Sequence, residues 1–222
     1  MSKTLKNKKI LVTAGPTWVP IDKVRVISNV SSGLTGVTVA RMAAKMGSDV
    51  TLLLGPVNTT EDREQRTEDR IKIIRFKYFD ELQKLVKSEL RRKKYDILVH
   101  VAAVSDYKPA KAYLKKIKSG NKKLVLELRP TVKIVDQMRR QGKEAFLVMF
   151  KLEAGKSARE LVDTAYNSLR RAGADMIVAN NIDEITEKGH KAYIIDKDKN
   201  IIVVRTKKEL AKRLLSKIAA KL

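Results

Sequence analysis

Short runs of β-branched residues alternate along this chain with longer stretches of helical periodicity. This alternation is typical of a parallel sheet whose strands are connected by helices. Ala192–Asp196 and Ile201–Val204 flank the turn 197–200 and predict a terminal hairpin. The sequence therefore predicts an α/β fold: a Rossmann-like three-layer sandwich with a mostly parallel sheet, helices on both faces, and a C-terminal hairpin plus helix. The expected strands are 10–13, 50–54, 71–76, 97–102, 124–128, 145–150 and 176–179, and the expected helices are 34–46, 79–92 and those beginning at Ser157 and Thr206.

Both of the last two helices begin with a predicted capping box, formed by Ser157 with Glu160 and by Thr206 with Glu209. Residues 57–70 are expected to form a loop or a frayed helix, and residues 103–121 an irregular segment rich in lysine. No linker or internal repeat interrupts the pattern, so we expect one domain over residues 1–222.

The chain carries 48 Lys and Arg against 25 Asp and Glu, a formal net charge of +23. Such a field attracts polyanions, including nucleic acid and phosphorylated small molecules. The basic residues are spread along the whole sequence and could equally reflect a thermophile's surface. The chain has no cysteine, and the apolar run after the basic N-terminus is too short for a signal peptide or membrane span. We therefore expect a cytoplasmic protein with no membrane partner.

Unusual residues cluster where the predicted strands end, which is where open α/β sheets bind ligands. The first strand is followed by Gly15, and Ser31, Ser32 and Gly33 then open the first long helix. Hydroxyls and free backbone N–H groups at a helix N-terminus favour a phosphate. The alternative is that a serine only caps the helix.

Four further clusters follow the same rule, although each is a weak signal alone. Ala103 and Asp106 leave a central strand, and Asp106 could hold a metal, accept a sugar hydroxyl, or simply form a turn. The segment 115–120 could be a solvated basic loop or a lid that delivers ammonium groups to phosphates. Phe150 and Asn180 end two other strands.

Several stretches resemble phosphopantothenoylcysteine synthetase, also called phosphopantothenate–cysteine ligase. They occur in that family's order and extend over nearly the whole chain. The stretches are Thr13–Thr17, Pro20–Asn29, Ser31–Gly33 with Gly36, Ala103–Pro109, Lys116–Lys118, Leu128–Thr131 and Ile177–Asn180.

The resemblance implies an ATP-grasp-independent ligase of coenzyme A biosynthesis. In similar enzymes the carboxylate of 4′-phosphopantothenate attacks a nucleoside triphosphate, and L-cysteine then displaces the nucleoside monophosphate from the acyl-nucleotidylate. The resemblance assigns catalysis to Asn29, Arg25 and Lys116, and places Asp106 at the nucleotide and its Mg²⁺. It implies a homodimer with a flap and interface at about 103–129. The nucleotide-binding residues would be Gly15, Ser31, Ser32, Gly33, Ala103, Asp106, Lys118, Phe150 and Asn180.

The chain departs from the bacterial pattern at two places. Met149–Glu153 replaces a Gly-Phe-Ala-Ala-Glu stretch and looks like the eukaryotic form, and Ser168 and Ala172 replace two lysines. Bacterial members favour CTP whereas eukaryotic members can use ATP, so we expect CTP, with ATP as the alternative.

Two other functions were weighed against the ligase. A nicotinamide-dependent reductase expects an acidic residue at the end of the second strand, where this chain has Leu52–Gly55. Pro109 would also break a helix aligning Tyr107 with Lys111. A basic nucleic-acid-binding α/β module without ligase activity rests on the net charge alone and lacks a recognition motif. No specific nucleic acid is therefore expected.

Overall fold

The computed structural model describes residues 4–57, 70–120, 122–186 and 189–222. An eight-stranded sheet forms the centre, in the order β12-β11-β10-β9-β6-β1-β4-β5. Six neighbouring strands, from β10 to β5, are parallel, and β11 and β12 complete the sheet as an antiparallel edge. These eight strands are β1 (Lys9–Ala14), β4 (Asp49–Leu54), β5 (Ile71–Arg75), β6 (Ile97–His100), β9 (Phe146–Glu153), β10 (Met176–Asn181), β11 (Ala192–Asp196) and β12 (Ile201–Val204).

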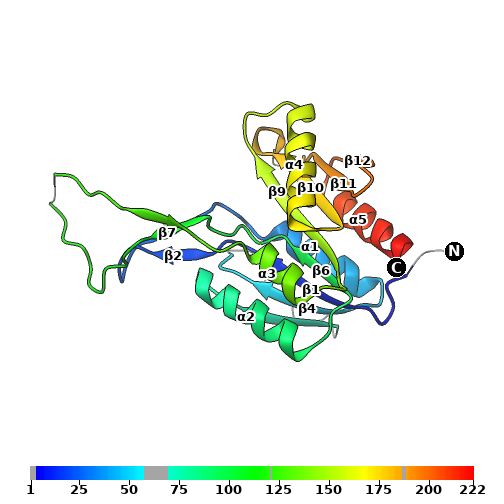
Figure 1. Cartoon of the computed structure of the whole chain (residues 1–222), viewed down its shortest axis with the longest axis horizontal. Coiled ribbons are helices and arrows are strands. Elements are labelled where there is room, and N and C mark those ends of the chain that lie inside the picture. The colour runs from blue at the N-terminus through cyan, green and yellow to red at the C-terminus, as the bar shows by residue number, and fades with distance from the viewer. Residues whose placement is uncertain (1–3, 58–69, 121, 187–188) are drawn as a thin grey trace.

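Helices cover both faces of this sheet, as the sequence predicts (Figure 1). Alternate residues of each strand point to opposite faces, so Ile10 and Val12 pack with α1 and α5, whereas Leu11 packs with the other three helices. The α/β sandwich is therefore confirmed. The helices are α1 (Leu34–Lys45), α2 (Phe79–Arg92), α3 (Ile134–Gln141), α4 (Ala158–Ala172) and α5 (Lys207–Lys221), with a 3-10 turn η3 (Ile182–Glu184).

The parallel strands follow the order β5-β4-β1-β6-β9-β10, which is the doubly wound order of dinucleotide-binding folds. The chain runs outward in one direction from β1 through β4 to β5, and in the other direction from β6 through β9 to β10. The strand order reverses between β1 and β6. The carboxyl ends of these two strands mark the position where such folds bind ligands.

Two small antiparallel ribbons form an arm that projects from the sandwich (Figure 1). One ribbon pairs β2 (Trp18–Pro20) with β3 (Val26–Ser28), and the other pairs β7 (Tyr107–Pro109) with β8 (Leu128–Pro130). We call residues 18–28 and 107–130 the arm. The N–H of Tyr113 donates to the carbonyl of Ile21 and joins the two ribbons.

Several sequence predictions need correction. The strand expected at 124–128 lies instead at Leu128–Pro130, and the strand expected to reach residue 102 ends at His100. Thr206 caps α5 by accepting the N–H of Glu209, but the Glu209 carboxylate accepts the N–H of Arg205, so no reciprocal box forms. The prediction for 57–70 falls mostly outside the described residues.

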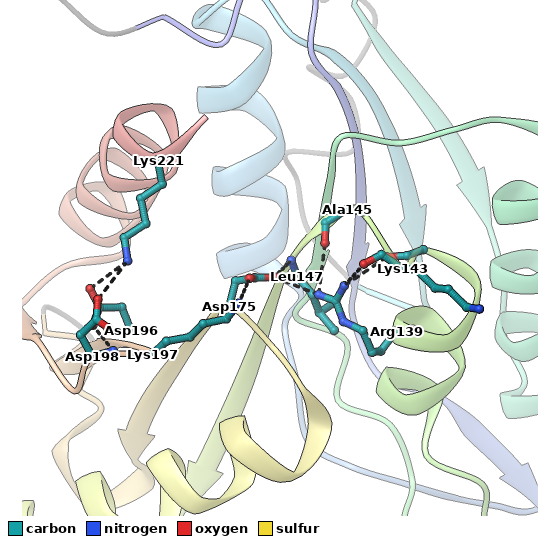
Figure 2. Close-up of polar contacts among 10 residues, drawn as sticks. Arg139, Lys143, Ala145, Leu147, Asp175, Asp196, Lys197, Asp198 and Lys221 are labelled. Carbon is teal, nitrogen blue, oxygen red and sulfur yellow. Dashed lines mark hydrogen bonds and ion pairs between the residues drawn. The ribbon is translucent and has the colours of Figure 1, made fainter.

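The buried carboxylate of Asp196 fixes the antiparallel edge of the sheet (Figure 2). Asp196 accepts hydrogen bonds from Asn200 in the hairpin turn and forms ion pairs with Lys217 and Lys221 of α5. Burial opposes its ionisation, but these donors hold the pKa of Asp196 well below its ordinary value. The hairpin and the last helix are therefore held together by one charged group.

None of the helices in the described part of the chain has the length and apolar character needed to cross a bilayer.

Candidate functional site

Glycines allow the ends of β1 and β4 to approach the start of α1. Gly33 has a φ of 72°, and a Cβ atom on it would lie 2.7 Å from the Val57 side chain and 3.3 Å from the Gly15 Cα atom. A Cβ on Gly36 would lie 2.5 Å from the Ala14 Cβ atom. Side chains at these positions would separate the helix from the strand. The first turn of α1 therefore rests directly on the carboxyl end of β1.

The serines before α1 do not act as its N-cap. That position belongs to Gly33, and no side chain caps the helix. The hydroxyl of Ser31 accepts the N–H of Gly33, and that of Ser32 accepts the N–H of Leu34, each two residues further on. The first turn carries no acidic residue. The positive end of the helix dipole is thus uncompensated by a carboxylate of its own turn, which suits an anionic ligand.

The loop that leaves β6 is held against the loop that leaves β1. Ala103 bridges to Pro16, its carbonyl accepts the N–H of Thr17, and its own N–H donates to Gly15. The buried hydroxyl of Thr17 accepts the N–H of Ser105 at 2.9 Å. The two loops that flank the topological switch point are therefore one hydrogen-bonded unit.

Asn29 belongs to the same unit. Its Nδ2 atom donates to the carbonyl oxygen of Val104 at 3.0 Å, two residues before Asp106. Asn29 and Val104 are 75 residues apart in the chain. The fold nevertheless brings Asn29, expected to be catalytic, to the loop that carries Asp106, expected to bind nucleotide.

Asp106 is exposed and is contacted by the segment that leads into α3. Its Oδ1 atom lies 2.5 Å from the Nζ atom of Lys133, and its carbonyl accepts the N–H of Thr131. No cluster of three or more metal-binding side chains occurs in the described part of the chain. A single exposed carboxylate fits Mg²⁺ when phosphates and water supply the other ligands.

Arg25, Lys116 and Lys118 lie on the arm and are organised by Asp22, a residue with no role in the sequence-based site. The Asp22 side chain is buried. One of its carboxylate oxygens accepts the N–H of Ile117 at 3.0 Å and pairs with Nη1 of Arg25, also at 3.0 Å. The N–H donated by Ile117, and then those of Val24 and Arg25, hold the pKa of Asp22 below its ordinary value.

This carboxylate holds the backbone of Ile117, the residue between Lys116 and Lys118, beside Arg25. The guanidinium of Arg25 also donates to the Ile117 carbonyl at 3.4 Å. Asp22 also accepts the N–H groups of Val24 and Arg25, two and three residues further on, and so forms an Asx-turn, a conformation that aspartate favours.

Phe150 and Asn180 lie near the same edge of the sheet. β9 and β10 pair in parallel, with Phe150 opposite Val178 and Asn180 opposite Leu152. Asn180 is buried and Phe150 packs against the core shared with α1. Among the described residues, the Asn180 side chain forms no hydrogen bond with Asn29 or Asp106, and a phenylalanine ring has no such group to offer. Phe150 and Asn180 therefore share the rim but not the hydrogen-bonded unit.

His100 was also missed by the sequence-based prediction. Its Nδ1 atom lies 2.8 Å from the Thr13 hydroxyl, which accepts the N–H of Ala102. Burial lowers the pKa of His100 to about 4. The imidazole is therefore neutral at physiological pH and supports the start of the loop that carries Ala103 and Asp106.

The strand order and this rim define a Rossmann-like α/β protein with an anion-favouring site at its switch point. The chain belongs to the family of the DNA/pantothenate metabolism flavoprotein C-terminal domain, which matches residues 5–222. That match confirms the extent of the resemblance found in the sequence.

Similarity to individual proteins agrees with the family. The chain is 39% identical over 217 residues to the "Coenzyme A biosynthesis bifunctional protein CoaBC" of Thermococcus kodakarensis, covering 97% of this chain and 52% of the relative. It spans about half the length of the curated relatives it matches.

Solved structures share the fold along almost the whole chain. The DNA/pantothenate metabolism flavoprotein from Streptococcus pneumoniae superimposes with a TM-score of 0.86 at 29% identity, covering 97% of this chain and 100% of that one. Cab2 carrying the substitution H337A, in complex with phosphopantothenate-cysteine, has a TM-score of 0.77 at 17% identity, covering 97% and 87%. The latter similarity concerns the fold alone.

Proposed function

We propose that this chain is a phosphopantothenate–cysteine ligase of coenzyme A biosynthesis. The carboxylate of 4′-phosphopantothenate attacks the α-phosphate of a nucleoside triphosphate, forming an acyl-nucleotidylate and releasing pyrophosphate. The amine of L-cysteine then attacks the acyl carbon, forming the amide and releasing the nucleoside monophosphate and a proton. The observation that carries the proposal is the Asn29 amide bonded to the Asp106 loop at the switch point, in a chain that matches this family over residues 5–222.

Some residues of the site would orient the acyl-nucleotidylate, and others would compensate the negative charge of the phosphates. Asn29 orients the acyl-nucleotidylate without repelling its phosphate, because an amide is neutral. Arg25, Lys116 and Lys118 compensate phosphate charge when the arm approaches the rim. Transfer at phosphorus depends on positioning and electrostatic stabilisation more than on a covalent nucleophile. The site needs no cysteine or catalytic serine for that reason.

The nucleotide is assigned to the rim around the start of α1. Gly15, Ser31, Ser32 and Gly33 form the phosphate side, Ala103 and Asp106 the opposite side, and Phe150 and Asn180 the outer boundary. Asp106 would hold Mg²⁺, which when bound neutralises phosphate charge. Lys133 would have to release Asp106 for this purpose, because the two groups are paired at 2.5 Å.

CTP is the proposed nucleotide and ATP the alternative. The stretch Met149–Glu153 resembles the form that accompanies ATP use, so both nucleotides belong in one assay. We further propose a single catalytic domain over residues 1–222, a homodimer whose flap and interface lie at about 103–129, and reaction in the cytoplasm.

The test is a pyrophosphate-release assay with 4′-phosphopantothenate, L-cysteine, MgCl₂ and either CTP or ATP. The expected result is release that requires phosphopantothenate and one nucleotide, with phosphopantothenoylcysteine detected by mass spectrometry only when cysteine is present. Omission of each component serves as the control. Absence of the product with both nucleotides contradicts the proposal.

A further inference from the structure

The net charge of +23 exceeds anything that the proposed site requires. Basic residues are spread along the whole sequence, and three of them recur at helical spacing within the predicted helix 79–92. Lys84, Lys87 and Arg91 are exposed on α2 and recur three and four residues apart, so they lie on one side of that helix. With Ser88 and Arg92 they line one shallow depression. We call this set the α2 basic face.

The acidic residues of α2 compensate this face only in part. Among the described residues, Glu89 pairs with Arg92, whereas no ion pair involves Lys84, Lys87 or Arg91. Glu81, in the first turn, accepts the N–H groups of Lys77 and Tyr78 and also interacts electrostatically with Lys84.

Favourable interaction with the helix dipole explains basic residues in the last turn, such as Arg91 and Arg92. It does not explain Lys84 and Lys87, which lie one to two turns earlier. Lys84 and Lys87 therefore need another explanation, and an anionic partner provides one.

The chemistry of the face favours a phosphodiester backbone over an acidic protein. Protein interfaces have an apolar, aromatic-rich centre, but no large hydrophobic side chain of α2 is exposed. Lys84 and Arg91 are about 10 Å apart along the helix axis, a distance over which one nucleic-acid strand carries about three phosphates. The hydroxyl of Ser88 adds a donor, and α2 itself carries no exposed aromatic ring that could stack on a base.

The position of the face keeps it apart from the candidate site. α2 follows β5 at the carboxyl edge of the sheet and leads to the amino end of β6, so the basic residues run away from the rim. Figure 1 shows α2 at the periphery of the molecule. We propose that the α2 basic face binds the phosphodiester backbone of nucleic acid without regard to base sequence, as a function additional to the proposed ligation.

The test is fluorescence anisotropy of the full chain with labelled 20-nucleotide RNA and with a duplex DNA of the same length, from 50 to 200 mM KCl. Three phosphate contacts predict that affinity falls about 20-fold for the single strand and about 40-fold for the duplex over this range. The substitutions K84E, K87E and R91E together should weaken binding at least tenfold at 100 mM KCl.

The matched control is K208E, K212E and R213E on α5, which packs on the opposite face of the sheet. Both triple variants lower the formal net charge from +23 to +17, because each of three reversals removes two charges. The control should lose less than threefold in affinity. Pyrophosphate release should remain unchanged in both variants, and this separates a failure here from a failure of the proposed ligase.

Three results would overturn the inference. Equal weakening by both triple variants would mean that the overall field, and not the α2 basic face, attracts the polyanion. Full competition by a polyglutamate peptide of equal charge would indicate an acidic protein partner. Absence of binding at 50 mM KCl would exclude any such function.

Discussion

Asn29 matters as a neutral hydrogen-bond donor, so its role can be tested by an almost isosteric change. Asn29→Asp removes the amide that donates to Val104 and places a negative charge where a phosphate is proposed to bind. Loss of one preorganised donor of this kind costs about 2.7–4 kcal/mol of barrier, or roughly 10²–10³ in kcat. Pyrophosphate-release kinetics together with thermal unfolding measure this effect. The neighbouring exposed residue provides the control, Val30→Ala, and equal turnover in Asn29→Asp and wild type would refute the role.

His100 gives stability a pH dependence of known sign. The unfolded imidazole binds a proton below about pH 6.5, whereas burial lowers the folded pKa to about 4. The unfolded state therefore binds more protons in this window, and the free energy of unfolding decreases as pH falls from 6.5 to 4, by at most about 3 kcal/mol. Urea unfolding at several pH values should show this loss in wild type and a smaller one in His100→Gln. Parallel pH profiles for the two proteins would contradict the assignment.

The helices and strands that could be predicted from the sequence are those whose apolar residues recur at a regular spacing. The strands of the sheet are apolar runs, and α4 begins with the capping box of Ser157 and Glu160. The arm was not predicted as two ribbons because β7 and β8 have three residues each and pair across a long separation in the chain. α3 was missed because it has only eight residues and its N-cap residue, Lys133, makes no capping hydrogen bond with its side chain. Short elements specified by distant partners carry no local signal.

Within the arm, the Asp22 carboxylate joins the segment 18–28 to the segment 107–130, and this connection can be tested by substitution. Asp22→Asn removes the charge that accepts the N–H of Ile117 and pairs with Arg25. Hydrogen exchange of the Ile117 amide should become at least tenfold faster, while the thermal midpoint stays within about 2 °C. Asp198→Asn, at an exposed turn position, is the control.

The Asp22 carboxylate also determines how hydrogen exchange of the Ile117 amide should depend on pH. The pKa of Asp22 is lowered in the folded chain, so the attachment persists down to the ordinary carboxyl pKa of about 3.9 and is lost below it. Wild-type protein should therefore keep the slow exchange of the Ile117 amide at pH 5. Exchange of that amide at equal rates in wild type and Asp22→Asn would show that the carboxylate does not hold the arm.

For the whole molecule, the site could be predicted in outline because strand ends meet at one edge of a parallel sheet. That rule places Gly15, Ala103 and Asp106 together before any coordinates are known. It could not identify Lys133 as the partner of Asp106, or Thr13 as the partner of His100, because these contacts depend on how distant segments pack. The helical spacing of Lys84, Lys87 and Arg91 is visible in the sequence, but only the structure shows that these side chains line one depression.

The outer part of the arm exposes apolar side chains that a monomer would leave in water. Leu114 is 83% exposed, Val125 68% and Val24 65%, and exposed apolar surface of this kind marks interaction sites. With the proposed homodimer, sedimentation at micromolar concentration should give twice the chain mass of 25.1 kDa. Replacing Leu114 and Val125 together by lysine should produce a monomer, because the new charges would be buried at the interface without partners.

The matched control for the arm is the exposed edge strand β12. Ile201 and Val203 are also partly exposed apolar residues, and replacing both by lysine should leave the dimer intact. If the β12 variant dissociates while the arm variant does not, the dimer forms through the sheet edge instead. If the wild-type protein is monomeric at all concentrations, no second copy covers the apolar residues of the arm, and the proposed homodimer is contradicted. That result would also limit the proposed catalytic unit to a single chain, in which Arg25 and Lys116 must reach Asn29 from their own arm.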